Sequence, residues 1–125
     1  MNKLLLALAL ACAPAAALAA DMGGSWTINA AFDSMGIKYV ATCTLKDDGT
    51  GKVSGPCHLS NGDQAATDPQ ATGTIAGGTF DLGYDTTYQG TPVHLEYKGP
   101  VAADGTVTGT IDTGGPQGTF TASKQ

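Results

Sequence analysis

Apolar and polar residues alternate with a period of two along most of the chain after residue 20. Glycine, threonine and aspartate residues punctuate this alternation about every eight to twelve residues, and no stretch there shows the period of an α-helix. Short strands with one apolar, buried face and one polar, solvent-exposed face, joined by tight turns, are typical of a β-sandwich or a β-barrel. The alternation therefore predicts an all-β domain.

The alternation divides into eight predicted strands whose apolar positions share one face. The predicted inward residues are Trp26, Ile28, Ala30, Phe32, Ile37, Tyr39, Ala41, Cys43, Leu45, Val53, Cys57, Leu59, Ile75, Phe80, Leu82, Tyr84, Val93, Leu95, Tyr97, Val107, Ile111, Phe120 and Ala122. Most connections are short and place neighbours in sequence side by side, whereas residues 61–69 form a longer polar loop. Eight strands in this order have exposed edges unless the sheet closes. An eight-stranded antiparallel up-and-down barrel is therefore favoured, and a two-sheet β-sandwich is the alternative.

Residues 1–20 have the layout of a bacterial secretory signal peptide. A polar, positively charged start precedes an unbroken apolar run over residues 4–11, and a small-x-small cleavage pattern ends at Ala19. The run is too short to span a membrane. We expect cleavage near Ala19 or Ala20 to leave residues 21–125 as a single all-β domain. This domain would be periplasmic or secreted, without membrane insertion.

The three cysteines bear on compartment and stability. Cys12 lies in the predicted signal peptide, and an alternative makes it a lipidation cysteine, although Ala9 stands where such sites have leucine. Cys43 and Cys57 are otherwise the only pair, and export favours a disulfide between them over free thiols or half of a metal site. Both lie on the apolar face of adjacent strands, so the bond is expected on the inward side of the sheet, between the second and third strands. Pro56 next to Cys57 predicts a bulge or a sheet edge there.

The charge balance narrows the classes of partner. The chain has eleven acidic residues against six lysines, and it contains no arginine. A net charge of −5 without arginine leaves no basic surface for nucleic acid or for an anionic membrane. We therefore expect no nucleic-acid partner.

Residue types that carry catalysis or metal binding are sparse. His58 and His94 fall in the outward register of two strands that are not neighbours in such a barrel, and no G-x-S-x-G, H-x-H or phosphate-loop motif occurs. The acidic turns at 47–49 and 61–63 resemble fragments of calcium loops, but neither continues with the remaining ligands of a complete site. The sequence therefore predicts no enzyme activity, no cofactor and no metal site.

The predicted barrel interior mixes aromatic and small side chains. An eight-stranded barrel is just wide enough to be filled by side chains or to hold one small ligand. The candidate ligand contacts are the inward aromatic residues Trp26, Tyr39, Phe80, Tyr84 and Tyr97. Their phenolic hydroxyls could orient a largely apolar ligand. The pattern leaves open whether these rings fill the interior or line a pocket.

Gly24, Ser25 and Trp26 resemble the G-x-W signature of lipocalins and the similar start of avidin-like barrels. The chain has no arginine to stack on this tryptophan, as lipocalins usually have, and one tryptophan where avidin-like pockets use several. The resemblance implies a barrel with Trp26 packed at its closed end. The same start and a single disulfide also resemble small periplasmic inhibitors of secreted metalloproteases. Those inhibitors insert an N-terminal trunk into the protease, and here only residues 21–23 precede the motif.

These observations predict an exported, monomeric, non-enzymatic binding protein that holds a small apolar ligand in the mouth of a barrel. Two alternatives stay open: a periplasmic protein-binding module such as a hydrolase inhibitor, and a structural β domain without a ligand. A hollow interior favours the first function, and a filled interior with an exposed apolar surface favours the other two. We expect Trp26 to be buried, because its register matches Ile28 and Phe32.

Overall fold

The computed structural model describes residues 22–60 and 68–125, so the predicted signal peptide and most of the predicted loop at 61–69 lie outside the described residues. The elements in chain order are β1 (Gly24–Phe32), the 3-10 helix η2 (Asp33–Met35), β2 (Ile37–Asp47), β3 (Lys52–Ser60), β4 (Gln70–Ala76), β5 (Thr79–Tyr88), β6 (Thr91–Pro100), β7 (Val107–Asp112) and β8 (Gln117–Lys124). No helix within these two ranges is long and apolar enough to cross a membrane.

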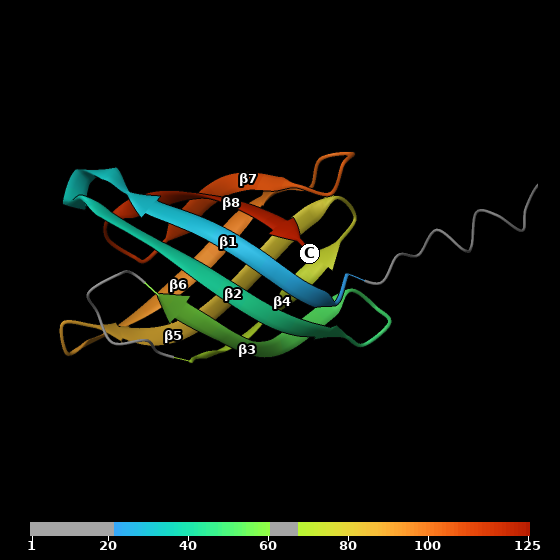
Figure 1. Cartoon of the computed structure of the whole chain (residues 1–125), viewed down its shortest axis with the longest axis horizontal. Coiled ribbons are helices and arrows are strands. Elements are labelled where there is room, and N and C mark those ends of the chain that lie inside the picture. The colour runs from blue at the N-terminus through green and yellow to red at the C-terminus, as the bar shows by residue number, and fades with distance from the viewer. Residues whose placement is uncertain (1–21, 61–67) are drawn as a thin grey trace, which may run out of the picture.

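The strands form a closed antiparallel barrel (Figure 1). Each strand pairs with its neighbours in sequence, and β8 pairs back onto β1, so the edges that an open sheet would expose are hydrogen-bonded to each other. The predicted up-and-down barrel is confirmed, and the sandwich alternative is wrong. Connections alternate between the two ends of the barrel: η2 and the β5–β6 and β7–β8 turns lie at one end, and the β2–β3, β4–β5 and β6–β7 turns lie at the other.

The face predicted to point inward forms the core. All but four of the predicted inward residues are buried, and those four, Ile37, Tyr39, Leu59 and Val93, are partly buried. Ala71 of β4 is also fully buried, although the alternation does not single it out. The period-two pattern therefore identifies the core correctly, because side chains alternate between the two sides of a barrel wall.

Cys43 and Cys57 lie opposite each other on β2 and β3. Their sulfur atoms are 2.03 Å apart, at disulfide distance, and both residues are buried, as predicted. The predicted bulge or sheet edge at Pro56 is wrong. The β2–β3 ladder has the same offset on both sides of Pro56, since Cys43 lies opposite Cys57 and Lys46 lies opposite Ser54. The pairing is interrupted opposite Gly55 and Pro56, where the proline offers no N–H donor, and it resumes in the same register without an inserted residue.

Glycines occur where the barrel needs a tight turn or a close strand approach. Gly77 and Gly78 connect β4 to β5 with φ angles of 63° and 79°, the left-handed values that a two-residue hairpin turn requires. Gly109 of β7 lies so close to β6 that a Cβ atom there would come within 1.9 Å of the Lys98 carbonyl oxygen. The absence of a side chain at Gly109 therefore lets these two strands pack closely.

Candidate functional site

The barrel is hollow at the end that carries η2 and the β5–β6 and β7–β8 turns. A cavity of about 470 Å³ opens there. Apolar side chains and neutral polar groups line it: Phe32, Met35, Ile37, Tyr39, Leu59, Ser60, Thr86, Thr87, Tyr88, Gln89, Thr91, Pro92, Val93, Leu95, Thr113 and Pro116. None of these described lining residues carries a charge.

The apolar wall of the cavity is made by inward residues near the ends of strands. Ile37 begins β2, Leu59 lies next to the last residue of β3, and Val93 is the third residue of β6. Leu95 lies two residues further along β6 on the same face. The four predicted inward residues that are only partly buried all belong to this lining. The cavity therefore lies where the inward face of the barrel extends beyond its packed centre.

Two exposed apolar side chains stand at the opening. Met35 of η2 is 46% exposed and Tyr88, the last residue of β5, is 36% exposed, and both belong to the cavity lining. These two side chains enlarge the apolar surface that a molecule bound in the cavity can contact.

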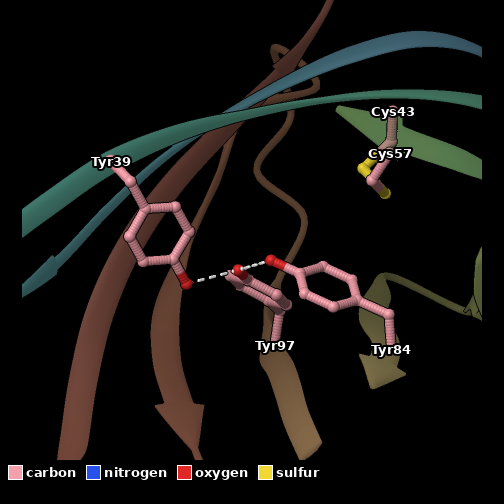
Figure 2. The surroundings of a disulfide bond; sticks show 5 residues. All are labelled: Tyr39, Cys43, Cys57, Tyr84 and Tyr97. Atoms are coloured by element: carbon pink, nitrogen blue, oxygen red, sulfur yellow. Dashed lines mark hydrogen bonds between the residues drawn. A yellow bond between two sulfur atoms is a disulfide. The ribbon is translucent and has the colours of Figure 1, made fainter. Parts of the chain in front are cut away.

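Three tyrosine hydroxyls meet inside the barrel (Figure 2). The hydroxyl oxygens of Tyr39 and Tyr97 are 2.6 Å apart, and the Tyr84 hydroxyl is hydrogen-bonded to the same Tyr97 oxygen. Tyr97 is therefore the central member of this tyrosine cluster (Tyr39, Tyr84 and Tyr97). Tyr97 is fully buried and Tyr84 is 2% exposed, whereas Tyr39 is partly exposed and lines the cavity. The cluster thus connects the cavity to the packed interior.

Burial controls the protonation of the tyrosine cluster. Desolvation raises the pKa of all three phenols, most clearly at Tyr84 and Tyr97, because a phenolate inside the barrel would lose its hydration. At Tyr97 both neighbouring phenols add to the rise in pKa, whereas at Tyr84 the nearby Tyr39 raises the pKa further and the hydrogen bond with Tyr97 lowers it. All three hydroxyls therefore stay protonated at physiological pH and act as neutral hydrogen-bonding groups.

The opposite half of the barrel is filled by aromatic rings. Trp26 is fully buried, as predicted, and its Nε1 donates a hydrogen bond to the Met22 carbonyl oxygen at 2.9 Å. The Trp26 ring lies 5.3 Å from that of Phe80, which lies 5.7 Å from that of Phe120. Phe120 in turn packs edge-on against Tyr97 at 5.2 Å. These contacts form a continuous aromatic stack that ends at the tyrosine cluster.

The five predicted ligand contacts are thus divided between the two halves of the barrel. Tyr39 lines the cavity, and Tyr84 and Tyr97 adjoin it through the hydrogen bond to Tyr39. Trp26 and Phe80 belong to the filled half and do not line the cavity. The sequence left open whether the interior is filled or hollow, and the structure shows that each description holds for one half.

Sequence reasoning missed the aliphatic wall of the cavity. Ile37, Leu59, Val93 and Leu95 all belong to the predicted inward set but not to the predicted ligand contacts. Their positions in the sequence could have identified them, because they lie near connections between strands and successive connections lie at alternate ends of the barrel. Every second connection of an up-and-down barrel lies at the same end, so inward residues next to those connections share one mouth.

Both histidines lie on the outer surface, as their register predicts. His58 Nδ1 is 2.7 Å from Asp68, and the two ring nitrogens of His94 are each 2.7 Å from a carboxylate, Asp85 for Nδ1 and Glu96 for Nε2. The strands that carry the histidines, β3 and β6, are not neighbours in the barrel. No group of three His, Cys, Asp or Glu residues in the described part of the chain is placed to hold a metal ion.

A second hollow of about 740 Å³ lies on the outer surface of the barrel. Its lining includes exposed side chains of β1, β2 and β8, such as Asn29, Lys38, Val40 and Thr121, and also the inward residues Ala30, Tyr39 and Phe120. It is more open to solvent than the smaller cavity at the mouth. The mouth cavity is therefore the better candidate for a ligand site.

The chain matches no family model, no curated protein and no solved structure. The lipocalin-like, avidin-like and inhibitor-like resemblances therefore stay predictions. The function is inferred from the cavity and from the chemistry of its lining.

Proposed function

We propose that this protein is an exported, non-enzymatic binding protein that holds one small, largely apolar molecule in the cavity at the barrel mouth. The observation that carries the proposal is the cavity itself, about 470 Å³ in volume and lined by apolar and hydroxyl-bearing side chains. Small-molecule sites usually have volumes of about 300–1,000 Å³ and a lining of this composition.

The strands that form the wall support binding because they hold the cavity open before a ligand arrives. Leu59, Val93 and Leu95 are strand residues whose backbones belong to the closed barrel. A ligand that enters does not have to order these residues, so less of the hydrophobic gain is offset by lost conformational entropy. Water leaving the aliphatic wall provides the main driving force.

The same lining supports a role without catalysis. Its described members offer hydroxyl and amide groups but no carboxylate, imidazole, amine or thiol. The raised pKa values of the tyrosine cluster make its phenols weaker acids than ordinary tyrosines, and their phenolate forms are not populated near neutral pH. These tyrosines are therefore poorly suited to general acid–base catalysis. The proposal therefore assigns no reaction to the cavity.

The cysteine pair supports the exported location. Cys43 and Cys57 lie at disulfide distance inside the barrel. Disulfides persist in the periplasm and outside the cell, whereas the cytosol keeps thiols reduced. The pair therefore fits the predicted signal peptide, and we propose that the domain works as a monomer in the periplasm or after secretion.

A second candidate function is a protein-binding module, such as a hydrolase inhibitor. Met35 and Tyr88 favour it, because exposed apolar side chains at the mouth are suited to contact with another protein. The two functions differ in what occupies the mouth. A small molecule would enter the cavity, whereas a protein partner would cover its opening.

Blocking the cavity tests the leading function. In Val93→Trp a bulky ring replaces a side chain of the cavity wall, and the matched control Val40→Trp makes the same change on the outer surface. The neutral fluorescent probe N-phenyl-1-naphthylamine is titrated into each protein from residue 21 onward. We expect saturable binding of one probe by the unsubstituted protein and by Val40→Trp. Val93→Trp should bind roughly tenfold or more weakly, which corresponds to about 1.4 kcal/mol or more.

The outcome separates the candidates. Equal probe binding by both tryptophan variants would place the probe outside the cavity and overturn the proposal. Native mass spectrometry of protein isolated from its own host gives an independent result. A co-purifying small mass that Val93→Trp lacks supports the ligand site, whereas a co-purifying protein favours the second candidate.

A further inference from the structure

The tyrosine cluster has one more hydrogen-bond donor than it can use internally. Each of Tyr39, Tyr84 and Tyr97 has one O–H donor and an oxygen that can accept. The cluster contains two hydrogen bonds, both to Tyr97, and each bond uses one hydrogen (Figure 2). Three hydroxyl hydrogens are thus available for two bonds, so one O–H needs an acceptor from outside the cluster.

Burial decides which hydroxyl carries the surplus hydrogen. If Tyr39 donates to Tyr97 and Tyr97 donates to Tyr84, the unpaired O–H belongs to Tyr84, which is only 2% exposed. If Tyr39 and Tyr84 both donate to Tyr97, the unpaired O–H belongs to Tyr97, which is fully buried. An unpaired buried donor is unfavourable in both cases. In the remaining arrangement Tyr84 donates to Tyr97 and Tyr97 donates to Tyr39, so the surplus O–H belongs to Tyr39. Tyr39 is the one member that lines the cavity, so this direction is favoured.

A ligand that only donates a hydrogen bond fits this arrangement less well. The Tyr39 oxygen already accepts from Tyr97, so such a ligand would use its second lone pair and leave the Tyr39 hydrogen without an acceptor. A ligand that accepts from Tyr39 leaves all three hydroxyl hydrogens paired. The lining also contains no charged side chain among the described residues, so a charged acceptor such as a carboxylate would lose hydration without an ionic partner.

We infer that the cavity selects neutral, largely apolar molecules that carry a hydrogen-bond acceptor oxygen, such as a ketone or ester carbonyl, and that the Tyr39 hydroxyl donates to this oxygen. The inference rests on the proposed function, since it names the ligand class of the same cavity. Tyr84 and Tyr97 act as positioning residues, because their hydrogen bonds set the direction in which Tyr39 donates.

Three rigid molecules of nearly equal size and shape test the inference. 9-Fluorenone has a carbonyl acceptor, carbazole has an N–H donor, and fluorene has neither group. Each is used to displace N-phenyl-1-naphthylamine from the protein. We expect fluorenone to bind roughly three- to tenfold more tightly than fluorene, as one neutral hydrogen bond provides, and carbazole to bind no better than fluorene.

Two tyrosine-to-phenylalanine variants assign the contact. Tyr39→Phe removes the proposed donor, whereas Tyr88→Phe removes a hydroxyl from the exposed rim of the same cavity. We expect Tyr39→Phe to bind fluorenone and fluorene equally and Tyr88→Phe to keep the preference. The infrared carbonyl stretch of bound fluorenone should lie at the lower frequency of a hydrogen-bonded ketone in the unsubstituted protein and at the higher, unbonded frequency in Tyr39→Phe. Circular dichroism checks that both variants are folded.

The possible results distinguish this inference from the proposed function. If all three molecules bind equally and the bound carbonyl is not hydrogen-bonded, the ligand class is wrong while the cavity stays a binding site. Tightest binding of carbazole would mean that the cluster accepts instead of donating, which also overturns the inference. If none of the molecules and no naphthylamine probe binds, the proposed function itself fails. If Tyr39→Phe does not fold, equal binding of the three molecules by the unsubstituted protein still overturns the inference.

Discussion

Replacing Trp26 by alanine should remove a large part of the stability of the barrel. The indole is fully buried, its ring lies 5.3 Å from that of Phe80, and its Nε1 donates to the Met22 carbonyl oxygen. Truncating a buried tryptophan typically costs about 3–5 kcal/mol, which includes the cavity left behind. Small domains have only about 5–15 kcal/mol of stability in total. A loss of roughly 4 kcal/mol would lower the Tm by about 15–30 °C.

The assay must not depend on tryptophan fluorescence, because Trp26 is the only tryptophan in the chain. Urea unfolding of the alanine variant is therefore followed by circular dichroism. Trp26→Phe keeps a ring against Phe80 but loses the Nε1 donor, so it should cost less, about 1–2 kcal/mol. Tyr88→Ala, at an exposed aromatic residue, should change stability by no more than about 0.5 kcal/mol.

The unsubstituted protein gives a second readout of the same burial. Its emission comes from Trp26 alone and should be blue-shifted in the native state and move to longer wavelength on unfolding. Native emission like that of free tryptophan in water, or an alanine variant that unfolds at the same urea concentration as the unsubstituted protein, would refute the reasoning. Trp26 does not line the mouth cavity, so any folded fraction of Trp26→Ala should still bind N-phenyl-1-naphthylamine.

Two further predictions concern the disulfide and the outer surface. Thiol titration of the protein from residue 21 onward, under denaturing, non-reducing conditions, should find no free thiol, and two free thiols would contradict the disulfide. The Cys43→Ala/Cys57→Ala variant should lose about 3 kcal/mol of stability, because the bond closes a short loop with a sequence separation of 14. Hydrogen bonds from His94 to Glu96 and to Asp85 raise the pKa of the imidazole above its usual 6.5, so NMR titration should find a higher value that falls in Asp85→Asn. Because the folded-state pKa is the higher one, the stabilisation from His94 should be complete below about pH 6.5 and lost as the pH rises through the folded-state pKa. A pKa at or below 6.5 would contradict the observed contacts.

The fold was largely predictable because its signal is local. Period-two alternation assigns Trp26, Phe80 and Tyr97 to the inside of the barrel whatever the other strands do, since neighbouring side chains in a strand point to opposite faces. The short turns then give the strand order, and the disulfide follows from the matching inward positions of Cys43 and Cys57. The bulge predicted at Pro56 failed, because a proline in this closed sheet is accommodated without an inserted residue.

The candidate site was predictable only in part. Of the aromatic residues predicted to contact a ligand, Tyr39 lines the cavity, while Trp26 and Phe80 pack in the opposite half. The aliphatic residues Leu59 and Val93 were placed inside the barrel but not at its mouth. Sequence pattern distinguishes inside from outside, but it does not give the height of a residue along the barrel axis.

The amino-acid sequence by itself determined which side chains face inward and the order of the strands, because both depend on residues close together in the chain. It also determined the pairing of the cysteines, because each had a single available partner. Tertiary structure alone decided that one half of the barrel is filled and the other hollow, and that Tyr39, Tyr84 and Tyr97 meet at the boundary. The physical reason is that side chains from β2, β5 and β6 reach the same height only through the stagger of the hydrogen-bonded strands around the closed ring. That stagger is a property of the whole barrel.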